Sequence, residues 1–266
     1  MVTNWVQLEA RAYWLVLVVT FLAVAMWESR RPLLRLKVPP ERRWPLNGIL
    51  MLISSVVWEA VYRAGPVAVA LRFASSPYGL LNRNGVPYAL RFAVTVVALD
   101  LVRYVAHWAE HRVSWLWRLH QVHHSDPDFD VATGFRAHPL ELVFTQGAQL
   151  AAVALLAPPV AAVLVAELTA AVEASFSHAN TQLPNWLETP LRLVWVTPGM
   201  HRIHHSVDVR EQKHNLGDVF PWWDRLFGTY QAAPAAGESS IDVGLKGCQT
   251  ASSVSLGFML AQPFRR

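Results

Sequence analysis

The sequence predicts an all-α integral membrane protein, a helical bundle of about four spans or re-entrant helices with a histidine-rich cap at its cytoplasmic end. Three observations support this fold class. Hydrophobic residues make up 53% of the 266-residue chain and charged residues only 16%, whereas about a quarter of residues are charged in a typical soluble domain. Several charge-free runs are as long as a membrane-spanning helix. Eight of the eleven histidines stand in three short clusters.

The spans are expected in order along the chain. Residues 12–27 carry no charge and have a tryptophan near each end, as a helix anchored at both membrane interfaces does. This run lacks a basic leader and a small-residue cleavage site, so we expect a retained helix and not a signal peptide. Weaker apolar runs at 46–62 and 86–106 predict the next spans, and residues 147–166 are again free of charge.

The stretch 140–176 could form one long kinked helix or two helices broken at Pro158-Pro159, because proline removes a backbone donor and clashes with the preceding turn. The basic stretch 28–43 is expected to stay cytoplasmic. If 140–176 forms a helical hairpin, 18 Lys and Arg residues lie on the cytoplasmic side and five on the other side. If it forms a single span, this excess of basic residues on the cytoplasmic side disappears. We therefore predict a hairpin, which places all the histidine clusters at one face of the membrane.

Composition also excludes several classes of function. The single cysteine, Cys248, rules out an intramolecular disulfide and any cysteine-based zinc or iron–sulfur site. The net charge of +4 is explained by Lys and Arg residues that are expected on the cytoplasmic side, next to anionic lipid. We find neither a glycine-rich phosphate loop nor a nucleic-acid-binding motif, so no nucleic-acid partner is expected.

The histidine clusters have the spacing of metal ligands. HWAEH separates His107 and His111 by four residues, and residues three or four apart share one helix face. HQVHHS at 120–125 and HRIHHS at 201–206 repeat the same pattern, and His178 is expected at the same face of the membrane. Imidazoles packed together would repel when protonated, whereas histidine is the commonest protein metal ligand. The clusters therefore predict metal binding.

Eight or nine imidazoles exceed the four ligands of one zinc site, so two metal ions are the economical count. Imidazole-rich sites suit iron, copper and zinc alike, and residue type alone does not choose between them. The absence of HExxH argues against a zinc protease.

Taken in order, these motifs resemble the fatty acid hydroxylase / sterol desaturase superfamily, including its bacterial members and the relatives of alkylglycerol monooxygenase. The matching string is D-x3-Y-x2-H-x3-H from Asp100 to His111, then the two HxxHHS motifs with an isolated His-Ala-Asn between them, and finally NLGDVFPWWDRLFGTY. It runs from about residue 90 to residue 230. We accordingly divide the chain into membrane helices and loops over 1–90, a hydroxylase-like catalytic domain over 91–230 and a loosely folded cytoplasmic tail over 231–266.

The resemblance implies a ligand set of nine histidines. They are His107, His111, His120, His123, His124, His178, His201, His204 and His205. Some relatives have a further histidine four residues before His178, where this chain has Ala174. One metal site is therefore expected to be a ligand short, with Glu173 or water as the replacement.

Other polar residues are candidates to support these ligands, because a ligating imidazole usually donates its second N–H to an acceptor. Asp100 lies two helical turns before His107 on nearly the same face, and could equally be a charge at the end of a span. A structural or supporting role is expected for His138, and a place at the rim for His214. The full set of candidates is Asp100, His138, Glu173, Asn180, His214, Asn215 and Asp224.

The activity that the resemblance implies is a membrane-bound di-iron monooxygenase, with two iron ions, O2 and external electrons acting on a C–H bond of a lipid. Zinc can occupy such sites during purification. No flavin or nicotinamide motif is present, so a separate reductase with a ferredoxin or cytochrome is expected as electron donor. The expected location is a bacterial inner membrane, with the site on the cytoplasmic side. Desaturation by the same centre remains open, and the alternative from another class is a non-catalytic metal-binding or metal-transporting membrane protein.

Overall fold

The structure, a computed structural model, describes residues 2–82 and 85–265. Within these residues the regular structure is helical, apart from one isolated antiparallel bridge between Ser206 and Val243. Residues 63–91 contain the short helix α3 (Pro66–Phe73), and residues 83 and 84 lie outside the described part, as does Arg266. The all-α fold class is confirmed.

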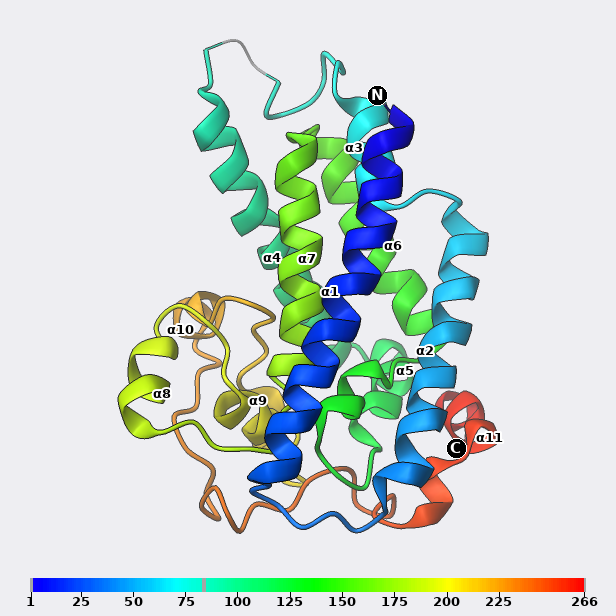
Figure 1. Ribbon diagram of the computed structural model, residues 1–266, viewed down its shortest axis with the longest axis vertical. Helices are drawn as coiled ribbons and strands as arrows, with labels where there is room; N and C mark the ends of the chain where they lie inside the picture. Colours follow the sequence, from blue (N-terminus) through cyan, green and yellow to red (C-terminus); the bar gives the residue numbers. More distant parts are fainter. Residues whose placement is uncertain (1, 83–84, 266) are drawn as a thin grey trace.

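The long helices run along the long axis of the molecule (Figure 1). They are α1 (Val2–Arg30), α2 (Pro40–Tyr62), α4 (Tyr88–Arg112), α6 (Pro139–Leu156) and α7 (Val160–Phe176). Helix α7 packs against α1 and α4, and α6 packs against α2 and α4. Helices are therefore present over the predicted apolar runs, with the run 147–166 divided between α6 and α7; α4 continues through both histidines of HWAEH.

Three segments are long and apolar enough to cross a membrane: Asn4–Arg30, Pro40–Phe73 and Pro139–Leu156. Most of their apolar side chains are not buried inside the bundle. Leu15, Val18, Val19 and Leu22 form an exposed face on α1. A contiguous apolar surface of this kind is unusual on a soluble monomer and is suited to contact with lipid tails. The protein is thus a membrane protein, as its composition predicts.

The break at Pro158-Pro159 produces the predicted hairpin. Helix α6 ends at Leu156, and Ala157 takes up a left-handed conformation with φ of 46°. Its N–H donates to Val153 O at 2.9 Å, which closes the last turn before α7 starts at Val160. The chain thereby reverses at the end of the bundle that also holds the N-terminus, and α7 returns toward the opposite end (Figure 1).

The shorter elements other than α3 collect at that opposite end, where the C-terminus also lies (Figure 1). They form a cap on the bundle, and we use this name for them below. They are α5 (Ser114–His124), η1 (Val131–Phe135), α8 (Asn185–Leu191), α9 (Pro198–His204), η2 (Glu211–Lys213), α10 (Trp222–Phe227), η3 (Ala251–Val254), α11 (Leu256–Ala261) and η4 (Gln262–Phe264).

The C-terminal segment 231–266 was expected to be loosely folded, and through residue 265 the structure corrects this. Gly244 N donates to His205 O at 2.9 Å, and Ser253 O accepts from Arg136 Nη2 at 2.6 Å. Met259 on α11 is fully buried in a cluster with Leu50 of α2. The composition of the segment gave no sign of these contacts, because most of them use backbone atoms.

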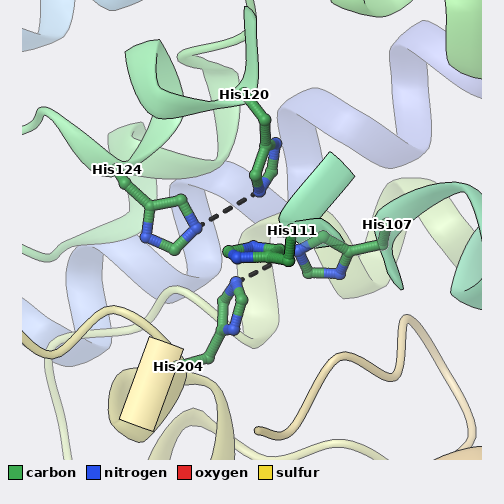
Figure 2. A group of neighbouring side chains, drawn as sticks. All are labelled: His107, His111, His120, His124 and His204. Atoms are coloured by element: carbon green, nitrogen blue, oxygen red, sulfur yellow. Dashed lines mark hydrogen bonds between the residues drawn. The ribbon is translucent and has the colours of Figure 1, made fainter. Parts of the chain in front are cut away.

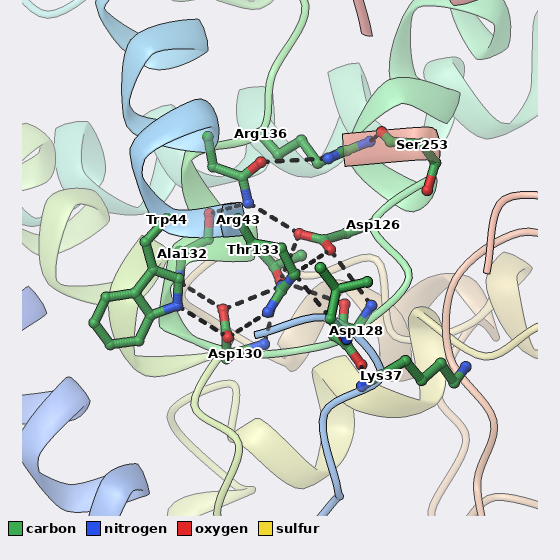
Figure 3. Close-up of polar contacts among 12 residues, drawn as sticks. Lys37, Arg43, Trp44, Asp126, Asp128, Asp130, Ala132, Thr133, Arg136 and Ser253 are labelled. Carbon is green, nitrogen blue, oxygen red and sulfur yellow. Dashed lines mark hydrogen bonds and ion pairs between the residues drawn. The ribbon is translucent and has the colours of Figure 1, made fainter. Parts of the chain in front are cut away.

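A buried ion-pair network attaches α2 to the loop after the first hexapeptide (Figure 3). Arg43 donates to Asp126 Oδ1 at 2.8 Å and to Asp130 Oδ2 at 2.5 Å, and no part of its side chain is exposed. Burial alone would raise the pKa of Asp126, yet Arg43 and Arg136 hold it down at about 2. The carboxylate is therefore ionised and paired, and the start of α2 fixes the chain directly after His124.

Candidate metal centre

All nine histidines predicted as ligands lie together at the cap end of the bundle, in two adjoining groups. Within each group the ring nitrogens that face one another lie within 4.8 Å. The five-histidine group consists of His107, His111, His120, His124 and His204, and the four-histidine group of His123, His178, His201 and His205. The separation that would have contradicted a shared site, with the 120s and 200s clusters at opposite ends of the bundle, does not occur.

The rings of the five-histidine group converge from three elements, α4, α5 and α9 (Figure 2). His107 Nε2 lies 3.0 Å from His204 Nε2, and His124 Nε2 lies 3.2 Å from His120 Nε2. Two nitrogens bound to one ion at about 2.1 Å lie about 3.0 Å apart when the angle between them is 90°. His111 Nε2 is buried without a hydrogen-bond partner among the described residues. These distances and this free nitrogen fit a metal ion.

The four-histidine group has the same geometry. His178 Nε2 lies 3.3 Å from His123 Nε2 and 3.0 Å from His201 Nε2. His205 Nε2 completes the group at 3.2 Å from His201 Nε2. The two groups touch, because the rings of His124 and His205 stack with centroids 4.6 Å apart.

The duplicated hexapeptide is explained by an exchange between the groups. In HQVHHS the histidines four apart, His120 and His124, belong to the five-histidine group, while His123 belongs to the other. HRIHHS reverses this arrangement: its outer pair joins the four-histidine group, and His204 joins the five-histidine group. Positions i and i+4 share a helix face and the i+3 side chain diverges slightly from it. Each copy of the motif therefore contributes to both groups.

Burial keeps these imidazoles neutral. It lowers the pKa of His120 and of His178 to about 3. For His123, His124, His201, His204 and His205, burial and then the neighbouring rings hold the pKa well below its usual range. Neutral imidazoles present a lone pair, which is the form that binds a cation.

Backbone carbonyls determine which nitrogen carries the proton in several rings. His107 Nδ1 lies 2.9 Å from Leu216 O. His204 Nδ1 lies 3.1 Å from His214 O. A carbonyl oxygen only accepts, so Nδ1 is the donor and the Nε2 lone pair faces the group. This is the arrangement found around metal-ligating histidines.

Two carboxylates beside His120 were not anticipated from the sequence. Glu141 Oε1 lies 2.8 Å from His120 Nδ1, and Glu110 Oε2 lies 3.5 Å from the same atom. Glu110 stands inside HWAEH, next to a predicted ligand. Glu141 follows His138 by three residues, a spacing that a helix N-cap explains equally well. Only the folded chain shows that α6 brings Glu141 to α5.

Asp100 and Asp224 support the histidines indirectly. Asp100 accepts from Val219 N at 2.9 Å and from Trp223 Nε1 at 2.7 Å. Asp224 accepts from Leu216 N at 2.8 Å. Neither carboxylate contacts a histidine ring. Together they fix the loop whose carbonyl, Leu216 O, orients His107.

Asn215 and His214 belong to the same loop. Asn215, at a φ of 52°, donates to Met200 O at 3.0 Å and so connects the loop to α9. His214 orients His204 through its backbone, while its own ring bonds to Arg210 O at 2.8 Å, away from both groups. This agrees with the expected place at the rim.

His138 and Asn180 have structural contacts. His138 caps α6, where its Nδ1 accepts from Leu140 N at 3.2 Å. Asn180 bonds to both backbone groups of Leu34 and thereby holds the loop after α1. The structure therefore does not place Asn180 beside a histidine ring as expected.

Glu173 is not in either histidine group. Its carboxylate accepts a hydrogen bond from Trp195 Nε1, so the structure does not support it as a replacement ligand. The four-histidine group nevertheless has one member fewer than its neighbour, as Ala174 predicts. Ala174 O bonds to His178 Nδ1 at 2.9 Å, and its side chain lines a cavity.

That cavity, of about 280 Å³, lies between α1, α4, α6 and α7 and opens onto both histidine groups. Its histidine wall is formed by His107, His120, His123, His178 and His201. Its other walls are formed by residues of the helix bundle, including Tyr13, Gln149 and Ala171. A ligand in this space would contact the histidines on one side and the bundle interior on the others.

The fold and the site define a membrane-embedded helical protein with a buried, histidine-rich site of the metal-binding type. The chain belongs to the fatty acid hydroxylase family, whose family model matches residues 92–229.

Among curated proteins, it is 32% identical over 182 residues to ornithine lipid hydroxylase OlsE of Rhizobium tropici, covering 68% of this chain and 52% of the relative. It is 29% identical over 143 residues to alkylglycerol monooxygenase of Homo sapiens, covering 51% and 29%. The corresponding values for Caenorhabditis elegans alkylglycerol monooxygenase are 32% over 137 residues, covering 50% and 25%. The chain thus spans about half the length, or less, of these relatives. No solved structure matches it significantly.

Proposed function

We propose that the protein is a membrane-bound monooxygenase that hydroxylates a C–H bond of a lipid, with two iron ions held by the nine histidines. One observation carries the proposal. Two adjoining groups of neutral imidazoles form the wall of a cavity that extends into the bundle, in a chain of the fatty acid hydroxylase family. Iron ions bound there would supply the O2 activation and C–H oxidation that side chains cannot perform.

The chain's own residues prepare this chemistry. The carbonyls of Leu216 and His214 and the carboxylate of Glu141 orient three of the rings. The surrounding helices exclude bulk water from the buried histidines. The side of the four-histidine group that carries Ala174 faces the cavity, so a lipid there could approach the site without displacing a side chain.

The relatives' names support a lipid substrate, since one is named for ornithine lipid and the others for alkylglycerol. Hydroxylation converts C–H, O2, two electrons and two protons into C–OH and water. We expect the electrons to come from a separate ferredoxin or cytochrome with its reductase. We also expect the histidine end of the bundle to face the cytoplasm of a bacterial inner membrane, because α1 ends there at Arg30 and is followed by Arg31 and Arg35.

Metal analysis combined with an O2-uptake assay tests the proposal. The full chain, reconstituted with ferrous iron under anaerobic conditions, is expected to retain two ions per chain and to consume O2 only with reductant and lipid. A product that gains one oxygen supports hydroxylation, and a product that loses two hydrogens supports desaturation instead.

Metal flux into proteoliposomes without O2 uptake would support a transporter and contradict the enzyme. The position of the histidines at one end of the bundle disfavours that alternative, since transporters hold their ligands near the middle of the membrane. Zinc in the purified protein would not decide between them.

A further inference from the structure

The walls of the cavity carry more charge than an alkyl chain requires. Arg103 on α4 and Glu167 on α7 form an ion pair of 2.6 Å between Nη2 and Oε1. Arg103 Nε also lies 3.7 Å from Asp218 Oδ2. Glu110 is the third carboxylate on the lining. The lining thus carries one guanidinium and three carboxylates, in a bundle where ionisable side chains are costly and tend to mark function.

Three oxygens on this lining have no hydrogen-bond donor among the described residues. They are Glu110 Oε1, Gln149 Oε1 and Asp218 Oδ2. Gln149 is only 3% exposed, and its Nε2 donates to Leu99 O at 3.0 Å. That bond fixes which end of the amide faces the cavity, so the free atom is an acceptor. Buried acceptors are normally satisfied, and leaving them unpaired destabilises the fold.

These acceptors are distributed along the cavity. Leu99, the partner of Gln149, precedes His107 by eight residues on α4, which corresponds to about 12 Å along a helix. Glu110 lies at the histidine end, next to His120. Methylene groups offer no donors to these atoms. A headgroup with several N–H donors would satisfy them, and a positive charge would balance the excess carboxylates.

We propose, on the basis of the function proposed above, that the cavity receives the cationic, amine-bearing headgroup of an aminolipid, with Gln149 and Asp218 setting this preference. Hydroxylation then takes place on or next to the headgroup and not along the acyl chain. The reaction keeps the balance given above: a headgroup C–H becomes C–OH, the second oxygen atom leaves as water, and the separate carrier supplies both electrons.

Binding of three lipids of equal chain length tests the proposal. Octadecylamine, its N-acetylated form and 1-O-octadecylglycerol are titrated against the full chain in nanodiscs, anaerobically and without reductant, so that no turnover occurs. We expect octadecylamine to bind at least tenfold more tightly than either neutral lipid. Equal binding of all three lipids would overturn the proposal, as would preference for the glycerol ether.

Substitutions in the cavity lining test whether the preference for the amine lipid arises in the cavity. Gln149→Leu and Asp218→Asn should each reduce the amine preference about threefold to tenfold, whereas Gln149→Glu, which adds a carboxylate, should increase it. Asp208→Asn is the matched control, because Asp208 lies outside the cavity lining and pairs with the exposed Arg210. If Gln149→Glu leaves the preference unchanged in a folded protein, the assignment is refuted.

Metal content and reductant-dependent O2 uptake are measured on the same preparations. If the amine preference is present and both of these are absent, the monooxygenase proposal fails while the headgroup site stands. If both are present and the amine preference is absent, the headgroup proposal fails alone.

Discussion

Replacing Arg43 by methionine is expected to destabilise the protein strongly, because it removes the cation that bonds directly to two buried carboxylates. In the folded chain the guanidinium bonds to Asp126 at 2.8 Å and to Asp130 at 2.5 and 3.2 Å, and none of these groups is exposed to solvent. Removing one partner of a buried ion pair costs about 3–5 kcal/mol. Methionine keeps most of the apolar stem, so the loss of charge dominates the effect.

The assay is thermal unfolding in detergent, followed by tryptophan fluorescence at pH 7. At about 2–4 °C per kcal/mol, the Tm should fall by about 10 °C relative to the parent. Arg42→Met is the matched control, because Arg42 is the exposed neighbour on the same helix. Adding Asp126→Asn to Arg43→Met should recover part of the loss.

The effect should also depend on pH. In the parent the pKa of Asp126 is about 2, below its usual 3.8, so its stabilising contribution is present above pH 4 and is lost as the pH falls toward 2. Without Arg43 this pKa should rise, because burial is then opposed by Arg136 alone, and the folded variant takes up a proton more readily than the folded parent does. The difference in Tm should therefore shrink between pH 7 and pH 5. An Arg43→Met variant as stable as Arg42→Met at pH 7 would refute this reasoning.

Three further outcomes are expected. Glu141→Gln should lower metal affinity about 10–100-fold in chelator competition, because it weakens the acceptor that orients His120, and unchanged affinity would contradict that role. Ala174→His should slow the removal by chelator of the ion proposed for the four-histidine group, because it adds a ligand there, and it should reduce turnover because it narrows the cavity. Faster removal of that ion would contradict the geometry of the four-histidine group. The metal-free chain should lose stability as the pH falls from about 6.5 toward 3, because folding lowers the pKa of His120 and His178 to about 3 and the unfolded chain therefore binds protons first. A Tm that does not change over this range would show that these rings are not buried as neutral groups.

Much of the site could be predicted because most of the candidate ligands stand close together in short sequence motifs. The spacing within HWAEH, HQVHHS and HRIHHS determines which rings share a helix face, and the hairpin at Pro158-Pro159 determines that α7 returns to the same end. Hydropathy and charge alone sufficed for those steps. They placed the three clusters and His178 at one end of the bundle, and the resemblance to the fatty acid hydroxylase superfamily implied the full set of nine ligands.

The surroundings of the ligands could not be predicted, because they depend on contacts between distant segments. Glu141 reaches His120 from a different helix, and Asp100 acts through a loop more than a hundred residues away. Asn180 and Glu173 have polar side chains near a predicted ligand in sequence, but their partners are Leu34 and Trp195. Proximity along the chain did not identify the partner in either case.

The exchange of histidines between the two hexapeptides has a consequence for how the centre assembles and fails. Because α5 and α9 each contribute rings to both groups, a shift of either helix disturbs both histidine groups together. With the two ions proposed above, an ion in one group would hold both helices in place and so preorganise the other group. Filling should consequently be cooperative, and half-loaded protein should be scarce during reconstitution.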